Sequence, residues 1–321
     1  MQKGFGFADE FKTAIKKYGI WPTTVWDCNY NDPLLQQLKK RVGDGCEERA
    51  ELDFTRGGSF NAGKGHGYKA EMGKGYKPKN KSSARAGCFT KKSDDKSKLY
   101  AGKISESIFN PVVAIWILNL FGPEKGTVFD PFAGGGCRAI AVAKKGLEYV
   151  GIELRQEEVN AIKDRLNRND CEAKIYCADS KNLKALKGGG IKNDSADFLI
   201  TCPPYYNLET YKGGENDISM AKTYDEFLKG IKETVKESKR ILKPGALSCW
   251  VVGLHRDKDG GLLSIHSDIA AIHKSLGFLH KEEVVLNLKN TGAIRRAGNF
   301  EKGDKRLIRT HEYLEVFVNT K

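Results

Sequence analysis

Two short segments, roughly 70 residues apart, carry the residue types that could bind a nucleotide and an aromatic amine. The first is Asp-Pro-Phe-Ala-Gly-Gly-Gly at residues 130–136, and the second is Thr-Cys-Pro-Pro-Tyr at residues 201–205. Residues 126–129 predict a short buried strand before the first segment, and a helix is expected to begin near Cys137. Three consecutive glycines let the backbone approach a ligand, and the helix start leaves N–H groups unpaired. Taken alone, this turn also fits dinucleotide oxidoreductases, or a tight turn that binds nothing.

Acidic residues follow three successive predicted strands. Asp130 follows the first strand, and residues 148–153 predict a second strand that ends in Glu153, where Rossmann folds place a carboxylate on ribose hydroxyls. A third strand is expected over residues 173–178, before Asp179 and Ser180. Open α/β sheets bind ligands at the carboxyl ends of their strands, so these side chains predict a nucleotide site.

The second segment follows a fourth predicted strand, residues 196–200, whose end should lie beside the first. Pro203 and Pro204 lack N–H donors and stiffen the backbone, which points a carbonyl outward, and Tyr205 offers a stacking face. This arrangement suits an aromatic base that carries an NH2 group. A rigid loop that closes the sheet is the alternative.

In this order the two segments resemble motifs I and IV of S-adenosylmethionine-dependent amino-methyltransferases that act on DNA, the N4-cytosine and N6-adenine group. Their usual forms are Asp-Pro-Phe-x-Gly-x-Gly and [Asp/Asn/Ser]-Pro-Pro-Tyr. The chain further resembles a phage and prophage subset, through residues 21–27, 107–111 and 312–318. One departure concerns Cys202, which stands where the family usually has Ser, Asp or Asn. A thiol accepts hydrogen bonds only weakly, so the target base and the catalytic strength stay open.

The resemblance implies a Rossmann-like class I methyltransferase fold with a doubly wound, mostly parallel α/β sheet. It implies direct methyl transfer from S-adenosyl-L-methionine to the exocyclic amino nitrogen of a flipped base in DNA, without a covalent enzyme intermediate. The expected catalytic residues are Cys202, Pro203, Pro204 and Tyr205. The expected cofactor contacts are Asp130, Pro131, Phe132, Ala133, Gly134, Gly136, Glu153, Asp179, Ser180, Thr201, Ser107 and Asn110.

Three other functions compete with this interpretation. A C5-cytosine methylase needs a nucleophilic Cys, but here Cys202 precedes the prolines, whereas that family has Pro before Cys. A methyltransferase that acts on a base amine in RNA would use the same two motifs, and competition between duplex DNA and RNA as substrates would distinguish it from a DNA methyltransferase. A catalytically silent DNA-binding phage protein is the third alternative, which failure to bind S-adenosylmethionine would support.

Charge and length indicate a polyanionic partner and one catalytic domain with an extension. The 321 residues carry a formal net charge of +13, and residues 61–98 hold ten Lys and one Arg against three acids. Residues 1–55 are predicted to pack on the catalytic domain, residues 56–102 to form a basic Gly/Lys-rich linker or DNA-contacting segment, and residues 103–321 to form the methyltransferase domain. A second basic loop, residues 289–310, offers DNA-binding candidates, although an ordinary solvated loop fits equally; they are Arg295, Arg296, Lys302 and Arg306.

Neither membrane nor metal chemistry is indicated by the sequence. No apolar run reaches membrane-spanning length, and the Lys-flanked N-terminus lacks a signal-peptide core, so we expect a cytoplasmic protein in a bacterium or phage-infected host. The eight Cys show no zinc spacing and are expected to be reduced and mostly buried. Further helices are predicted over residues 105–121, 137–145, 156–167, 224–242 and 265–276, with a turn at 243–245 and strands over 246–252, 283–288 and 313–318.

Overall fold

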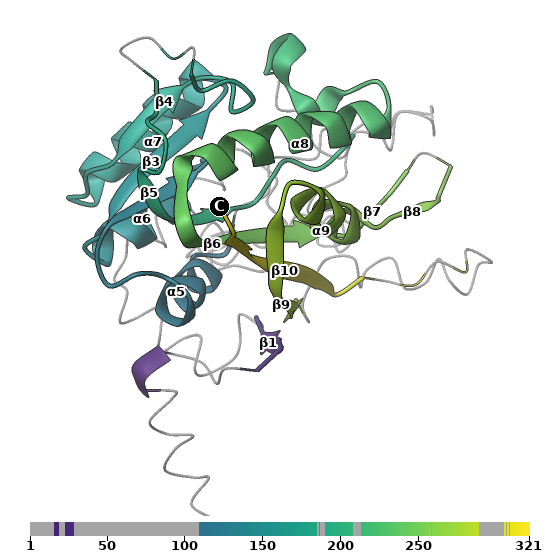
Figure 1. Ribbon diagram of the computed structural model, residues 1–321, viewed down its shortest axis with the longest axis horizontal. Helices are drawn as coiled ribbons and strands as arrows, with labels where there is room; N and C mark the ends of the chain where they lie inside the picture. Colours follow the sequence, from purple (N-terminus) through teal and green to yellow (C-terminus); the bar gives the residue numbers. More distant parts are fainter. Residues whose placement is uncertain are drawn as a thin grey trace, which may run out of the picture.

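The computed structural model describes residues 16–18, 23–28, 109–184, 186, 190–207, 213–257, 259–288, 305, 307 and 309–321. These residues form an eight-stranded sheet with helices on both faces (Figure 1). The strands are β1 (Val25–Asp27), β2 (Thr127–Asp130), β3 (Glu148–Glu153), β4 (Lys174–Cys177), β5 (Ala196–Thr201), β6 (Leu242–Gly253), β9 (Phe278–Asn287) and β10 (His311–Asn319).

The sheet order is β1-β9-β10-β6-β5-β2-β3-β4, and β10 runs antiparallel to both of its neighbours, while the other pairs are parallel. The predicted doubly wound, mostly parallel α/β sheet is therefore confirmed. The winding reverses between β2 and β5, and ligands of such sheets bind at this switch point. Both predicted motifs follow these two adjacent strands.

Helices cover the sheet on two faces because the side chains of each strand alternate. Val128 of β2 and Val251 of β6 pack under α5 (Pro111–Leu120), α6 (Cys137–Lys144) and α7 (Gln156–Arg168). Phe129 and Trp250 point to the other face, under α8 (Tyr224–Ile241) and α9 (Ile265–Ser275). Short elements complete the described fold at the strand ends; they are η5 (Gly214–Asn216), η6 (Ile218–Met220), β7 (His255–Arg256) and β8 (Leu262–Leu263).

Part of the N-terminal region belongs to the core of the sheet. Strand β1 pairs in parallel with β9, and Trp26 is only 1% exposed. Its ring packs edge-on against Trp116 of α5, with 5.9 Å between the centroids, and stacks on Phe121 at 6.5 Å. The domain boundaries predicted at residues 55 and 102 lie outside the described residues.

Two predicted elements differ from the structure. The turn expected at residues 243–245 lies inside β6, because β6 pairs with β5 both before it, at Leu242, and after it, at Leu247. The intervening residues form a bulge in which Gly245 has a φ of +77°, so a local turn signal was compatible with one interrupted strand. The strand predicted at 283–288 begins earlier, at Phe278, because β10 pairs along its whole length.

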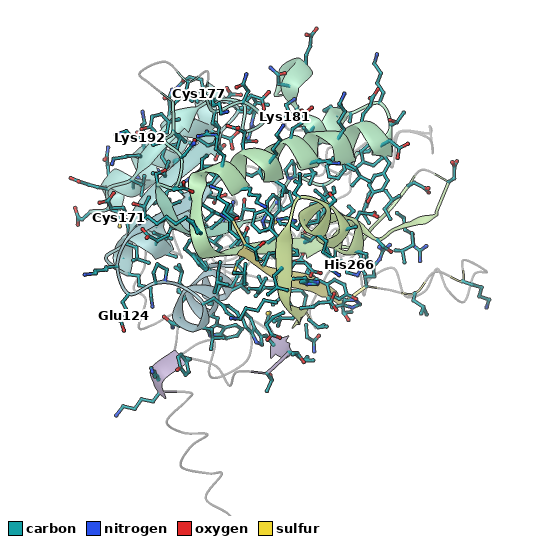
Figure 2. All side chains as sticks on the ribbon, in the orientation of Figure 1. Glu124, Cys171, Cys177, Lys181, Lys192 and His266 are labelled. Atoms are coloured by element: carbon teal, nitrogen blue, oxygen red, sulfur yellow. The ribbon has the colours of Figure 1, made fainter. Side chains whose placement is uncertain are left out.

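The described cysteines carry no disulfide, and four of the six are buried. Cys171 and Cys177 lie at the β4 edge of the sheet (Figure 2), where Cys177 is exposed. Cys46 and Cys88 lie outside the described residues. No helix in the described part of the chain has the length and apolar character needed to cross a membrane.

Candidate cofactor and base site

Asp130 joins the two predicted motifs at the switch point of the sheet. Its side chain is fully buried, and Thr201 at the end of β5 donates a hydrogen bond to Oδ1 at 2.6 Å. The Phe132 amide donates to the same oxygen at 3.0 Å, and the Tyr149 hydroxyl donates to Oδ2 at 2.7 Å. Burial raises the pKa of Tyr149, as does the carboxylate, which keeps this hydroxyl a donor. Asp130 and Thr201 thus hold the strand ends together, with both side chains directed at protein partners.

A buried arginine that the sequence analysis did not single out completes this cluster. Arg138, in the first turn of α6, is 4% exposed, and its Nε lies 2.6 Å from Asp130 Oδ2. Its Nη2 donates to the Phe132 carbonyl, and its guanidinium lies 4.7 Å from the centroid of the Phe109 ring. Burial by itself would lower the pKa of Arg138, but the Asp130 carboxylate raises it above its ordinary value. The signal available in the sequence was a charged residue inside the apolar helix that follows the glycines.

The glycine-rich turn has two left-handed residues with different surroundings. Gly136 caps α6 with a φ of +76°, and a Cβ there would lie 2.8 Å from Ile162 Cγ2 of α7. Gly134 has a φ of +52°, but a Cβ there would meet only the Phe132 carbonyl oxygen, at 3.8 Å. The turn is therefore packed tightly against α7 at Gly136 and open at Gly134.

Glu153 reaches this turn from the end of β3. Its Oε1 accepts a hydrogen bond from the Arg155 amide at 3.1 Å, and Arg155 Nε lies 3.6 Å from the same oxygen. Burial raises the pKa of Glu153, while hydrogen bonds from the Arg155 and Gly134 amides work against that rise. A mostly buried carboxylate thus lies beside the open glycine, as the strand-end argument predicted.

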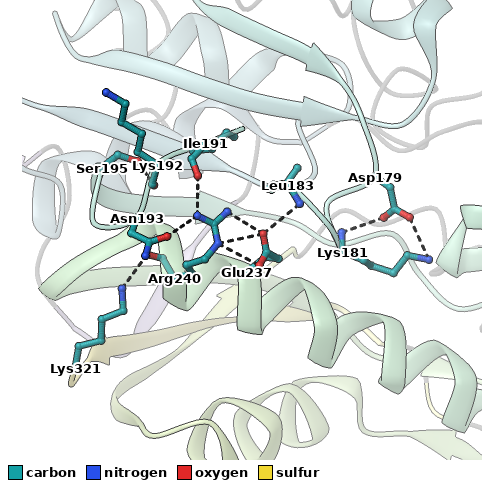
Figure 3. Close-up of polar contacts among 10 residues, drawn as sticks. All are labelled: Asp179, Lys181, Leu183, Ile191, Lys192, Asn193, Ser195, Glu237, Arg240 and Lys321. Carbon is teal, nitrogen blue, oxygen red and sulfur yellow. Dashed lines mark hydrogen bonds and ion pairs between the residues drawn. The ribbon is translucent and has the colours of Figure 1, made fainter. Parts of the chain in front are cut away.

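Asp179 and Ser180 follow β4 but point to different surroundings. Asp179 accepts a hydrogen bond from the Lys181 amide at 3.0 Å and pairs with Lys181 Nζ at 3.4 Å (Figure 3). Its side chain is 26% exposed, so it keeps access to solvent. Ser180 is buried, and its hydroxyl lies 3.3 Å from the Thr234 hydroxyl of α8. The Ser180 side chain therefore connects the end of β4 to α8.

The connection from β4 to β5 is held against α8 by hydrogen bonds to Arg240 and Glu237, two residues of α8 that also form an ion pair with each other. Arg240 pairs with Glu237 at 2.8 Å and also donates to the Ile191 carbonyl and to Asn193 (Figure 3). The Glu237 carboxylate in turn accepts a hydrogen bond from the Leu183 amide at 3.1 Å. These contacts position the segment that begins at Asp179.

The Pro-Pro-Tyr segment turns its two tyrosines in different directions. The Tyr205 hydroxyl donates to Glu312 Oε1 of β10 at 3.2 Å. Tyr206 packs under α8, with its ring centroid 5.6 Å from that of Phe227. Pro203 is buried and Pro204 is half-buried. Cys202 is half-buried, and its Sγ lies 4.0 Å from the Pro203 carbonyl oxygen.

Asn110 caps α5, with its Oδ1 accepting from the Val112 amide at 3.0 Å, so the helix predicted over residues 105–121 begins at Pro111. Several expected contacts lie outside the described residues; they are Ser107, Arg295, Arg296, Lys302 and Arg306. Among the residues that the structure describes, no group of three or more His, Cys, Asp or Glu side chains could hold a metal ion.

A sequence model of the DNA methylase family, the N6/N4 group, matches residues 196–321, which include the Pro-Pro-Tyr segment, β6, β9 and β10. The chain is also similar to the type II methyltransferase M.MjaVI of Methanocaldococcus jannaschii, with 27% identity over 110 residues, and to M.BglII of Bacillus subtilis, with 28% over 112 residues. The alignments cover 34% and 35% of the chain and only 54% and 28% of these relatives.

Solved structures with a similar backbone fold include a SAM-dependent methyltransferase from Methanosarcina mazei and TrmN from Thermus thermophilus. The first has a TM-score of 0.44 and 14% identity, and the match covers 64% of the present chain and 97% of the M. mazei chain. The second has a TM-score of 0.45 and 13% identity, covering 65% and 48%.

S-adenosyl-L-methionine is the methyl donor of the DNA methylase family, and the switch-point residues fit it. Gly134 leaves room where a ligand would approach the turn, and Glu153 supplies a mostly buried acceptor beside it. Asp179 supplies a second, accessible acceptor at the next strand end. Carboxylates at these positions match the hydroxyl and amine donors of a nucleoside.

Proposed function

We propose that the protein transfers a methyl group from S-adenosyl-L-methionine to the exocyclic amino nitrogen of an extruded base in duplex DNA, either N4 of cytosine or N6 of adenine. The observation that supports this most directly is the 2.6 Å hydrogen bond between Thr201 and Asp130. It ties the Pro-Pro-Tyr segment to the glycine-rich turn at the switch point. A donor bound at the turn and a base bound at the prolines would therefore be neighbours.

On the cofactor side, each residue has a role suited to its surroundings. Glu153 would accept from the ribose hydroxyls and Asp179 from the adenine amine, while the open Gly134 turn would lie under the methionine moiety. Asp130 and Thr201 would act as positioning residues, because their side chains are buried and bonded to protein partners. Asn110 would act through the start of α5, which it caps.

On the base side, the Pro203 carbonyl would accept a hydrogen bond from the target NH2 and favour a more tetrahedral nitrogen, whose lone pair is otherwise delocalised into the ring. Tyr205 would stack on the extruded base. Cys202 would border the NH2 edge, and a thiol there gives weaker acceptance than Ser, Asp or Asn. When bound, the cofactor supplies an electrophilic methyl group on its sulfonium. As the new N–C bond forms, the S–CH3 bond of the donor would break to leave S-adenosylhomocysteine, and the amine would lose one proton to solvent.

DNA as the substrate is supported by the matched family and by the net charge of +13. We propose that residues 56–102 and the loop at 289–310 supply the phosphate contacts, with residues 103–321 as the catalytic domain. Both basic segments lie largely outside the described residues. The phage or prophage origin and a partner nuclease of a restriction system belong to the same proposal.

The test is incubation of the purified protein and methyl-labelled S-adenosylmethionine with unmethylated duplex DNA, followed by nucleoside digestion and mass spectrometry. N4-methylcytosine or N6-methyladenine is the expected product, and it would identify the base. Formation of 5-methylcytosine would refute the amino-transfer mechanism and make Cys202 the nucleophile. Preferential methylation of RNA in a competition assay would refute DNA as the substrate.

A further inference from the structure

The Tyr205 ring, which follows β5, contacts two residues from the strands β6 and β10, Gly253 and Glu312. Its hydroxyl donates to Glu312 Oε1 at 3.2 Å, across 107 positions of the sequence. Its Cε1 and hydroxyl oxygen would lie 2.7 Å and 2.6 Å from a Cβ at Gly253. A side chain larger than a hydrogen at Gly253 would therefore displace the ring, so the ring rests on the bare backbone at the end of β6.

The sheet register explains why these three residues meet. Gly253 ends β6, and Glu312 is its direct partner near the start of β10. Because β10 runs antiparallel to β6, its beginning lies at the edge where β5 ends and the Pro-Pro-Tyr segment starts. The chain thus brings a carboxylate to Tyr205 only through the reversed strand.

The surroundings of Glu312 make its contact with Tyr205 effective. Burial raises the pKa of Glu312, and the hydrogen bond from Tyr205 opposes that rise. A hydrogen bond to a carboxylate is stronger than one between two neutral groups. Such a bond restricts the ring about its long axis, which sets the plane it presents to a stacked base.

We propose that Glu312 is a positioning residue of the methyl transfer, which fixes the plane of the Tyr205 ring against Gly253 so that an extruded base stacks with its NH2 group in line with the donor methyl. This inference rests on the proposed function and deepens it. Glu312 acts through the Tyr205 hydroxyl and not on the base itself.

A double-mutant cycle tests this route. Tyr205→Phe removes the hydrogen bond and should lower kcat on unmethylated duplex DNA about tenfold, the lower end of the range for a hydrogen bond to a charged group, while Glu312→Gln leaves a neutral acceptor and should lower kcat less, about fivefold. The affinity for S-adenosylmethionine should change less than about twofold, because neither side chain lies at the glycine-rich turn. The double variant should be no slower than Tyr205→Phe alone. Glu282→Gln, an exposed glutamate on the neighbouring strand β9, is the matched control and should keep wild-type kcat.

If the reduction of kcat in the double variant equalled the product of the two single reductions, the inference would be overturned, because Glu312 would then act independently of the Tyr205 hydroxyl. Unchanged kcat in Glu312→Gln would overturn it as well. A spectroscopic readout keeps the inference separate from the proposed function: 3-fluorotyrosine is incorporated at position 205, and its 19F resonance is recorded. Glu312→Gln should shift or broaden this resonance, and Glu282→Gln should not. An unshifted resonance in Glu312→Gln would refute the positioning role even if DNA methylation were established, while a shift without methylation of DNA would refute only the proposed function.

Discussion

Arg138→Met is the substitution that most directly tests how the strand ends are held together. The variant keeps a long apolar side chain but removes the guanidinium that lies 2.6 Å from the buried Asp130 carboxylate. Removal of one partner from a buried ion pair costs about 3–5 kcal/mol, because the other charge stays buried. Asp130 retains hydrogen bonds from Thr201, Tyr149 and the Phe132 amide, so we expect the lower end, about 3 kcal/mol.

The free energy of unfolding can be measured by urea titration, with tryptophan fluorescence and far-ultraviolet circular dichroism as two probes. Asp130→Asn removes the charge that Arg138 neutralises, so the double variant should be less destabilised than the sum of the single variants, by about 1–3 kcal/mol. Arg168→Met is the control, because Arg168 is exposed on α7 and its loss should cost less than about 0.5 kcal/mol. A value for Arg138→Met as small as that of the control would show that the ion pair does not stabilise the junction. Additive losses would show that the two side chains do not act on each other.

Further predictions concern the core, the cofactor and pH. Burial, followed by the nearby Glu283 carboxylate, raises the pKa of Glu315 to about 8, and His280, whose own pKa is lowered by burial, lies 2.7 Å from its Oε2 as a neutral ring, so native Glu315 keeps a proton that the unfolded chain releases above its ordinary pKa of 4.5. The free energy of unfolding of the wild type should therefore fall between about pH 4.5 and pH 8. The Glu315→Gln variant should lack this fall, so its stability relative to the wild type should rise across this range by about a few kcal/mol. Urea titrations at successive pH values measure the difference. Equal pH dependence in both proteins would contradict this. Glu153→Gln should weaken S-adenosylmethionine binding by about tenfold in calorimetric titration, since it removes a charged acceptor, and unchanged affinity would count against the ribose role. Trp26→Ala should cost about 3–5 kcal/mol of unfolding free energy, and a loss below 1 kcal/mol would mean that β1 does not contribute to the core.

Local sequence signals located much of the candidate site. The strand ends at Asp130, Glu153 and Asp179 could be inferred because an apolar run followed by a glycine or an acid is a short-range pattern. The structure brings Glu153 to the glycine-rich turn, as that pattern predicted. The direction of a side chain at a strand end was harder to infer, and Ser180 shows why: its hydroxyl faces Thr234, which lies 54 residues further along the chain.

The sequence by itself determined the order of strands and helices, the glycine-rich turn and the position of the Pro-Pro-Tyr segment at the end of a strand, because each depends on neighbouring residues. Only the tertiary structure decided that Arg138 would neutralise Asp130, that Trp26 would pack on α5, and that Glu312 would reach Tyr205. Those contacts depend on the sheet register and on the reversed direction of β10, which pair residues across separations that no local pattern records.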